Sequence, residues 1–89
     1  MRTFNKYIAI MGKCNNAPKE FENVHTHIMD IVKKYNLGLT NISRDIEEKE
    51  HIVFATTLFF NGEDNVALQI ISELESKMHI VSSNSGHIE

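Results

Sequence analysis

Two segments of the chain repeat apolar residues at helical spacing, and this pair of stripes constrains the fold more than any other feature. In the first segment the apolar positions lie three, four or seven residues apart, on one face of a helix: Phe21, Val24, Ile28, Ile31, Val32 and Tyr35. The second stripe consists of Ala67, Ile70, Ile71, Leu74 and Met78. The spacing predicts two helices that each bury a single face.

Two other segments have the features of β-strands that are covered on both sides. Residues 4–12 place apolar side chains on both faces of the predicted strand, with Phe4, Ile8 and Ile10 inward. Residues 51–60 are rich in β-branched and aromatic side chains and are also apolar on both faces. These two strands are therefore predicted at the centre of a sheet. The side chains predicted to face away from the helices are Tyr7, Ala9, Met11, Val53, Ala55, Thr57 and Phe59.

Two weaker segments are predicted as edge strands. Residues 39–46 alternate less cleanly, with Ile42 and Ile46 directed inward and polar side chains directed outward. A polar turn follows. The last strand is predicted to be short, at residues 79–83, because residues 84–86 are Asn, Ser and Gly.

Read in order, the predicted elements are strand, helix, strand, strand, helix and strand within 89 residues. This order matches the split β-α-β arrangement of ferredoxin-like folds. Right-handed crossovers place the first and third strands centrally in that arrangement, and these are the two strands with apolar residues on both faces. The sequence therefore predicts one α+β domain over residues 1–89, a ferredoxin-like βαββαβ fold with a four-stranded antiparallel sheet and two helices on one face.

The composition is that of a globular domain, with 42% hydrophobic and 24% charged residues. A formal net charge of −3 provides no positive field for phosphate backbones, so no nucleic-acid partner is expected. No apolar run approaches the roughly 20 residues of a membrane span, so no direct membrane insertion is expected. A single cysteine and the lack of a secretory leader predict a cytoplasmic location.

One cysteine and two histidines are predicted to meet at one rim of the sheet. Cys14 follows the first strand, while His51 and His79 open the third and fourth, and an antiparallel sheet brings these positions to the same end. Thiolate and imidazole groups are zinc ligands. The spacing gives such a site no support, because His25 and His27 on the helix above the rim lie about 200° apart. A metal-binding protein using Cys14, His51 and His79 is the third hypothesis, and no cofactor is expected.

No residue of the chain is assigned a catalytic role. Cys14 has no histidine at the spacing of a known nucleophile and base pair. The carboxylates Glu47, Glu48 and Glu50 flank Lys49 in a turn, a pattern typical of a solvated charge run. The glycines are isolated from one another, so the sequence contains no phosphate-binding loop. An enzyme is therefore not expected.

The order of the elements, the segment Tyr7–Lys13 and the segment Leu39–Ser43 with its Asn-Ile step resemble the ACT-domain superfamily over most of the chain. ACT domains are regulatory modules that bind amino acids or other small effectors, commonly at a dimer interface. The resemblance implies an effector site made by Lys13, Cys14, Asn15, Asn16 and Asn41. Residues 14–18 depart from the family pattern because they contain no glycine. ACT-like domains without that loop occur as the cytoplasmic C-terminal part of MgtC-type membrane proteins, which residues 74–82 resemble in layout.

The leading hypothesis is a non-enzymatic, ACT-like regulatory or assembly module that self-associates and binds a small effector of the amino-acid type at the rim. An isolated sheet face should carry polar residues at every second position, and the apolar face of the two central strands therefore predicts a homodimer. The predicted interface residues are Tyr7, Met11, Val53 and Phe59. The alternative is a small protein-binding inhibitor or adaptor, which an apolar sheet face would serve equally well.

Overall fold

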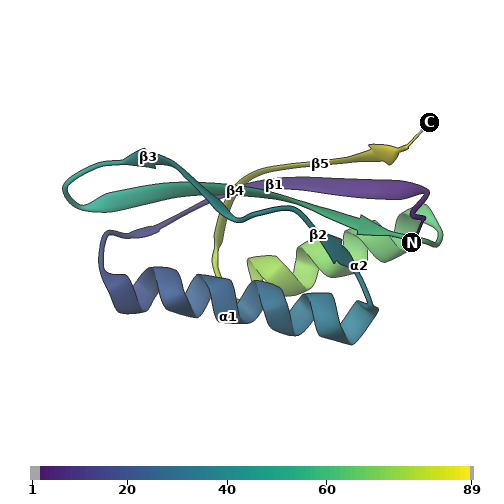
Figure 1. Ribbon diagram of the computed structural model, residues 1–89, viewed down its shortest axis with the longest axis horizontal. Coiled ribbons are helices and arrows are strands. Elements are labelled where there is room, and N and C mark those ends of the chain that lie inside the picture. The colour runs from purple at the N-terminus through teal and green to yellow at the C-terminus, as the bar shows by residue number, and fades with distance from the viewer. Residues whose placement is uncertain (1–2, 89) are drawn as a thin grey trace.

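The computed structural model describes residues 3–88. Within this range the elements are, in order, β1 (Lys6–Asn15), α1 (Pro18–Tyr35), β2 (Gly38–Leu39), β3 (Ser43–Glu47), β4 (His51–Phe60), α2 (Asp64–Glu75) and β5 (His79–His87). The strands pair antiparallel in the order β2-β4-β1-β5, and β3 pairs with β4 further along the same edge. Both helices lie on one side of this sheet (Figure 1). The predicted α+β, ferredoxin-like fold is confirmed, with five strands where four were expected.

The strands β1 and β4 are central, as the sequence predicts, and they pair from Lys6 opposite Phe60 to Asn15 opposite His51. Burial alternates along both strands, so each has two distinct sides. We call the side covered by α1 and α2 the helix face and the other side the open face. The inner faces of the predicted helices and central strands carry eight side chains that are expected to fix the core, and the core between the sheet and the helices contains all of them, namely Ile8, Ile10, Val24, Ile28, Ile31, Phe54, Ile70 and Leu74.

The first helix begins and ends at residues with clear backbone preferences. Pro18 stands at the start of α1, where a missing amide costs no helical hydrogen bond. Asn36 closes the helix in the left-handed conformation, with φ at 58°. From its residue type and its place before Pro18, Asn16 is the expected N-cap of this helix. This expectation is wrong, because the N-cap position is Ala17, without a side-chain cap. The side-chain amide of Asn16 instead donates to the carbonyl oxygen of Glu48 at 2.6 Å.

The predicted second strand is two strands, β2 and β3, because the chain between them leaves the ladder with β4. A bulge between Arg44 and Ile46 then reverses the alternation of side chains. Arg44 lies opposite Phe54 on the helix face, whereas Ile46 lies opposite Val53 on the open face. The expectation that Ile46 points inward is therefore wrong, and Ile46 is 52% exposed.

The last strand is longer than the sequence predicts. Asn84, Ser85 and Gly86, expected to interrupt the chain after Ser83, continue the pairing with β1 as far as His87. A ladder is held by main-chain hydrogen bonds, which polar side chains do not prevent. A nine-residue β5 therefore forms one edge of the sheet, with a register shift near Val81.

Candidate functional site

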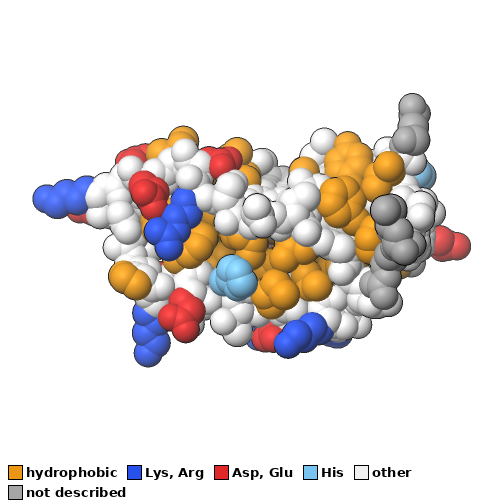
Figure 2. All heavy atoms as spheres, viewed as in Figure 1, with side chains coloured by type: hydrophobic (Ala, Val, Ile, Leu, Met, Phe, Trp, Pro, Cys, Tyr) orange, Lys and Arg blue, Asp and Glu red, His pale blue; other side chains and the backbone are white. Residues whose placement is uncertain are grey.

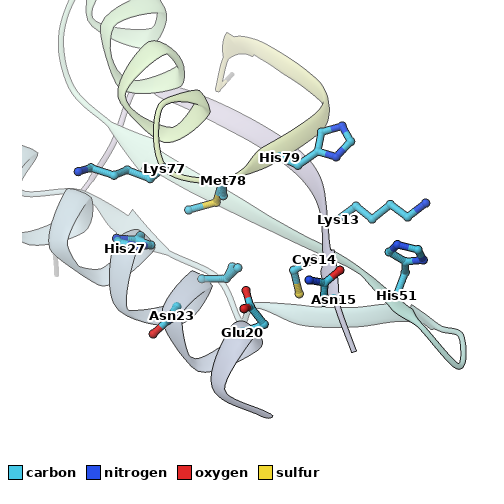
Figure 3. Close-up of a pocket in the computed structure, with 11 residues that line it drawn as sticks. Lys13, Cys14, Asn15, Glu20, Asn23, His27, His51, Lys77, Met78 and His79 are labelled. Carbon is cyan, nitrogen blue, oxygen red and sulfur yellow. The ribbon is translucent and has the colours of Figure 1, made fainter. Parts of the chain in front are cut away.

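A hollow of about 450 Å³ opens at the rim of the sheet where β1 ends and β4 and β5 begin. The first turns of α1 border it on one side, and the segment that links α2 to β5 borders it on another (Figure 3). We call this hollow the rim pocket. It is lined by Lys13, Cys14, Asn15, Glu20, Asn23, Val24, His27, His51, Lys77, Met78 and His79.

Three of the five predicted effector residues line the rim pocket, but as strand residues and not as a loop. Lys13, Cys14 and Asn15 are the last residues of β1, because β4 is long enough to pair with β1 to its end. Two residues then join β1 to α1. The backbone amide of Asn16 donates to the carbonyl oxygen of Glu50 at 2.8 Å, which fixes this short link against the turn between β3 and β4.

Asn41, the fifth predicted effector residue, lies away from the rim pocket. It follows β2 and lines a separate hollow of about 400 Å³ on the open face, with Met11 and Ala55 among its neighbours. The structure therefore does not bring Asn41 together with the four residues near the end of β1.

Cys14 lies on the helix face of β1, and its sulfur is directed toward α1 and the carboxylate of Glu20 (Figure 3). Burial raises the pKa of the Cys14 thiol, and the negative charge of Glu20 raises this pKa further, while the positive charge of Arg44 lowers it. A raised pKa favours the neutral thiol over the nucleophilic thiolate. Cys14 is therefore a weak nucleophile in this setting.

The three residues of the metal hypothesis share the predicted rim but not the same face of the sheet. Cys14 is on the helix face. His51 pairs with Asn15 and His79 pairs with Lys13, and alternation places these positions on the open side of the rim. Figure 3 shows both imidazoles directed away from Cys14. Among residues 3–88 the structure contains no group of three His, Cys, Asp or Glu side chains placed to hold a metal ion.

The polar side chains that α1 contributes to the rim pocket were not predicted as site residues. Glu20, Asn23 and His27 lie three and four residues apart, so they form one row along the helix beside its apolar stripe. Lys77 approaches the pocket from the segment after α2. The row on α1 has a recognisable spacing in the sequence, whereas the approach of Lys77 depends on tertiary packing.

The open face carries the four residues predicted as a homodimer interface. Tyr7, Val53 and Phe59 are half-buried and Met11 is 37% exposed, and Ile46 adds a more exposed apolar side chain at the same side. At one end the ring of Phe59 packs near that of Phe4, with centroids 6.2 Å apart. Figure 2 shows hydrophobic side chains along the seam between sheet and helices, and a second group at the end of the molecule where both chain ends lie.

Comparison with known proteins identifies the fold. No protein-family model matches the chain, and no curated protein matches it. The C-terminal domain of the MgtC protein from Mycobacterium tuberculosis matches 100% of this chain and 93% of its own length, with a TM-score of 0.66 and 18% sequence identity. The MgtC domain has an ACT-like fold, so the predicted fold resemblance is confirmed.

Two further solved structures match with lower scores. The de novo designed protein Ferredog-Diesel has a TM-score of 0.49 and 18% identity, with coverage of 97% of this chain and 87% of the designed protein. An amidase of the hydantoinase/carbamoylase family from Burkholderia multivorans has a TM-score of 0.37 and 9% identity, and the match covers 96% of this chain and 27% of the amidase.

Neither helix of the region from Thr3 to Ile88 is long and apolar enough to cross a bilayer.

Proposed function

We propose that the chain is a non-enzymatic, ACT-like regulatory module of the cytoplasm that self-associates through its open face and binds a small effector in the rim pocket. The observation that supports self-association best is the contrast between the two sides of β1 and β4. Both helices cover one side, yet the other side also carries apolar residues on both central strands. A one-sided antiparallel sheet in water should instead be polar on its uncovered side.

The open face has the composition of a contact surface. Its apolar residues come from three adjacent strands, β3, β4 and β1, and so form a continuous patch. Apolar patches of a few hundred Å² on a small protein usually mark a site of interaction. A second copy is the simplest partner, because a two-fold contact uses the same patch on both subunits.

The self-association is tested by measuring mass in solution and then charging the open face. Light scattering at tens of micromolar should give the mass of a dimer or larger assembly for the unmutated protein. Met11→Asp and Phe59→Asp should each weaken that assembly while the helical circular-dichroism signal persists. Thr26→Asp, which adds the same charge to an exposed site on α1, is the control and should leave the mass unchanged. A monomer mass for the unmutated protein would overturn the proposed self-association.

The effector proposal is supported by the charges around the rim pocket. The pocket is lined by an acidic side chain, Glu20, and by two basic ones, Lys13 and Lys77. Asn23 and His27 add hydrogen-bonding groups from α1. A free amino acid carries an ammonium and a carboxylate close together, so a pocket with both signs of charge and an amide suits this class of ligand.

Calorimetry with a panel of free amino acids tests the effector site. Glu20→Gln removes the acidic group and should abolish or strongly weaken binding. His27→Gln should weaken binding, and the matched change His25→Gln should not, because His25 is exposed on the same helix and does not line the pocket. Equal affinities for the His25 and His27 variants would contradict this placement of the ligand.

A protein-binding adaptor is the second candidate, and the hollow on the open face supports it. Its apolar lining includes Ala9, Met11 and Ala55, and its hydroxyl and amide groups include those of Thr40, Asn41, Ser43, Ser82 and Asn84. Protein interfaces commonly combine an apolar centre with a polar rim. If the chain is monomeric and keeps a stable fold, its open face is available to bind a different protein.

A further inference from the structure

The two edges of the sheet differ in their protection against pairing with another chain. On one edge β2 has two residues, and β3 carries Arg44, Asp45 and Glu47 together with a bulge. Short strands, charged side chains and bulges are the usual devices that keep an edge from adding a further strand. On the other edge β5 has nine residues, and none of them is Lys, Arg, Asp, Glu or Pro. Its irregularity lies near Val81, so Ser82–His87 is a regular, uncharged edge.

The register identifies which amides of β5 point away from the sheet. Hydrogen-bonded pairs alternate along an antiparallel ladder. The amide of Ile88 donates to the carbonyl oxygen of Asn5, so the amides of Gly86 and Asn84 also face β1. The amides of Ser83, Ser85 and His87 therefore point outward. No other strand of residues 3–88 lies on that side of β5 (Figure 1).

An exposed leucine and a hollow lie side by side along this edge. Leu68 on α2 is 68% exposed, although it is a large apolar side chain. It borders a hollow of about 280 Å³ between α2 and β5, which Phe60 and Ala67 line together with the ion pair of Lys6 and Asp64 and with Ser85, Gly86 and His87. One chain thus presents both an exposed apolar side chain and a recess of mixed polarity beside the same strand. Such a pair satisfies the requirement for a two-fold contact, in which each subunit supplies both complementary parts.

We propose that β5 pairs antiparallel with β5 of a second copy of this chain, which joins the two sheets into one continuous sheet. The outward amides of Ser83, Ser85 and His87 bond carbonyl oxygens of the second strand, and Leu68 packs beside the hollow of the partner. This contact uses an edge and a helix flank that the proposed open-face contact does not use. The two contacts together would build assemblies larger than a dimer.

A second copy fits this edge better than an unrelated extended peptide. Peptides that are bound specifically by strand addition have side chains that enter pockets along the edge. From Ser82 to Gly86 the strand offers serine, asparagine and glycine side chains. In an antiparallel pair of two such strands the facing side chains are small and uncharged, so neither steric overlap nor like charges oppose the approach.

The test begins from Met11→Asp, which removes the open-face contact and leaves β5 intact. This variant should form a dimer by light scattering at hundreds of micromolar. Adding Ser85→Pro removes an outward amide without touching the ladder to β1, and should convert the dimer to a monomer. Ser85→Ala at the same position keeps the amide and should remain dimeric. Circular dichroism confirms that each variant is folded.

The outcomes separate the two contacts. A Met11→Asp variant that is already monomeric, or a Ser85→Pro variant that stays dimeric, overturns the β5 contact and leaves the open-face contact standing. If Met11→Asp leaves the mass of an unmutated dimer unchanged while Ser85→Pro alone gives a monomer, the β5 contact stands and the open-face contact fails. A monomeric unmutated protein overturns both.

Two further measurements are specific to the β5 contact. In the Met11→Asp background, amide exchange at Ser83, Ser85 and His87 should slow as protein concentration rises. Leu68→Lys should weaken this dimer about tenfold or more because the leucine is buried on pairing, whereas Gln69→Lys on the exposed side of α2 should not. Exchange that is fast and independent of concentration at all three amides would contradict the pairing.

Discussion

The two faces of the sheet are made by the same strands, yet they differ in what covers them. On the helix face of β1 and β4, Ile8, Phe54 and Leu58 have no exposed surface. On the open face of the same strands Met11 is 37% exposed, and its neighbours are half-buried. Side chains one position apart in sequence therefore have different roles. The helix face holds the domain together, whereas the open face is available for contacts with another molecule.

Part of the open face is covered by the chain's own aromatic rings. Tyr7 lies over Gly86, whose added Cβ would be 2.8 Å from the Tyr7 hydroxyl oxygen. Phe4 lies in the same way over Gly38. Aromatic rings that lie across glycines in a neighbouring strand shield the exposed backbone. This end of the open face is therefore partly closed, while the region around Met11 and Ile46 is not.

The largest effects should come from truncating the helix face. Ile28→Ala and Ile70→Ala each remove a side chain with no exposed surface from α1 or α2 and should lower the free energy of unfolding by about 2 to 5 kcal/mol. Met11→Ala removes a comparable volume from the open face and should lower the free energy of unfolding of a single chain by much less. Urea unfolding of the three variants makes the comparison. Similar losses at Ile28 and Met11 would show that the two faces are not distinct.

Two glycines allow the same small change, the addition of one methyl group, to be compared on the two faces. In Gly12→Ala the new methyl group overlaps the ring of Phe54 on the helix face and lies 2.9 Å from the carbonyl oxygen of His79. A closely packed core cannot easily shift to accommodate a new group, so Gly12→Ala should lower the free energy of unfolding by about 1 to 3 kcal/mol.

Gly86→Ala places a methyl group against the ring of Tyr7 on the open face, 2.8 Å from its hydroxyl oxygen. That ring can tilt toward solvent, and alanine is favoured over glycine in a strand. The loss of stability should be smaller than for Gly12→Ala. Thermal unfolding of both variants measures the two losses, and a larger loss of stability for Gly86→Ala would mean that the open face is the more tightly packed.

The helix face is the part of the fold that the sequence predicts best. Its residues repeat at regular periods, three to four in the helices and two in the strands, and burial follows those periods along β1, β4 and both helices. The expectation that Phe4 points inward is wrong, because Phe4 precedes β1 and its ring packs near Phe59 on the open face. The prediction fails where the period itself is broken. The bulge after Arg44 adds one residue to β3, and nothing in the side chains of this polar strand marks it.

The candidate site is less predictable because its parts come from separate segments. The shared rim of Cys14, His51 and His79 follows from topology alone and is confirmed. Which face of the sheet each of the three occupies depends on whether Cys14 ends a strand or begins a loop. The length of β4 sets that boundary, because β1 pairs with β4 to its end. Lys77 joins the rim pocket through the packing of α2 against the sheet, which no local pattern reveals.

The bulge in β3 offers a sharper test of which face a residue occupies. Ile42 packs against the core, so Ile42→Ser should lower the free energy of unfolding by about 1 to 3 kcal/mol. Ile46→Ser should change it by less than about 0.5 kcal/mol, because Ile46 is already 52% exposed. Both changes are best measured in the Met11→Asp background, where association through the open face does not contribute. A loss at Ile46 as large as that at Ile42 would contradict the reversed alternation.

The smallest expected effect concerns the charge at the margin of the helix face. Lys6 is 8% exposed on β1, and its Nζ donates to the carboxylate of Asp64 on α2 at 2.9 Å. This hydrogen bond and the positive charge of Lys6 lower the pKa of Asp64. A carboxyl whose pKa is lower in the folded state stabilises the fold above its unfolded pKa, near pH 4, and that stabilisation is lost as pH falls through the lowered value.

Asp64→Asn should therefore make the free energy of unfolding fall less steeply with decreasing pH below about pH 4. The change in slope should correspond to less than one proton taken up on unfolding, and the slope at neutral pH should stay unchanged. The carboxylate is 84% exposed, so solvent screens the pair and keeps the effect small. Lys6→Met removes the partner and substitutes an apolar side chain of similar length at this buried position. If the hydrogen bond causes the shift, Lys6→Met should reduce the acid dependence as Asp64→Asn does, and the double variant should reduce it no further. Urea unfolding at a series of pH values from neutral to acid measures this, and a double variant with a still weaker acid dependence would assign the effect to separate interactions of the two side chains.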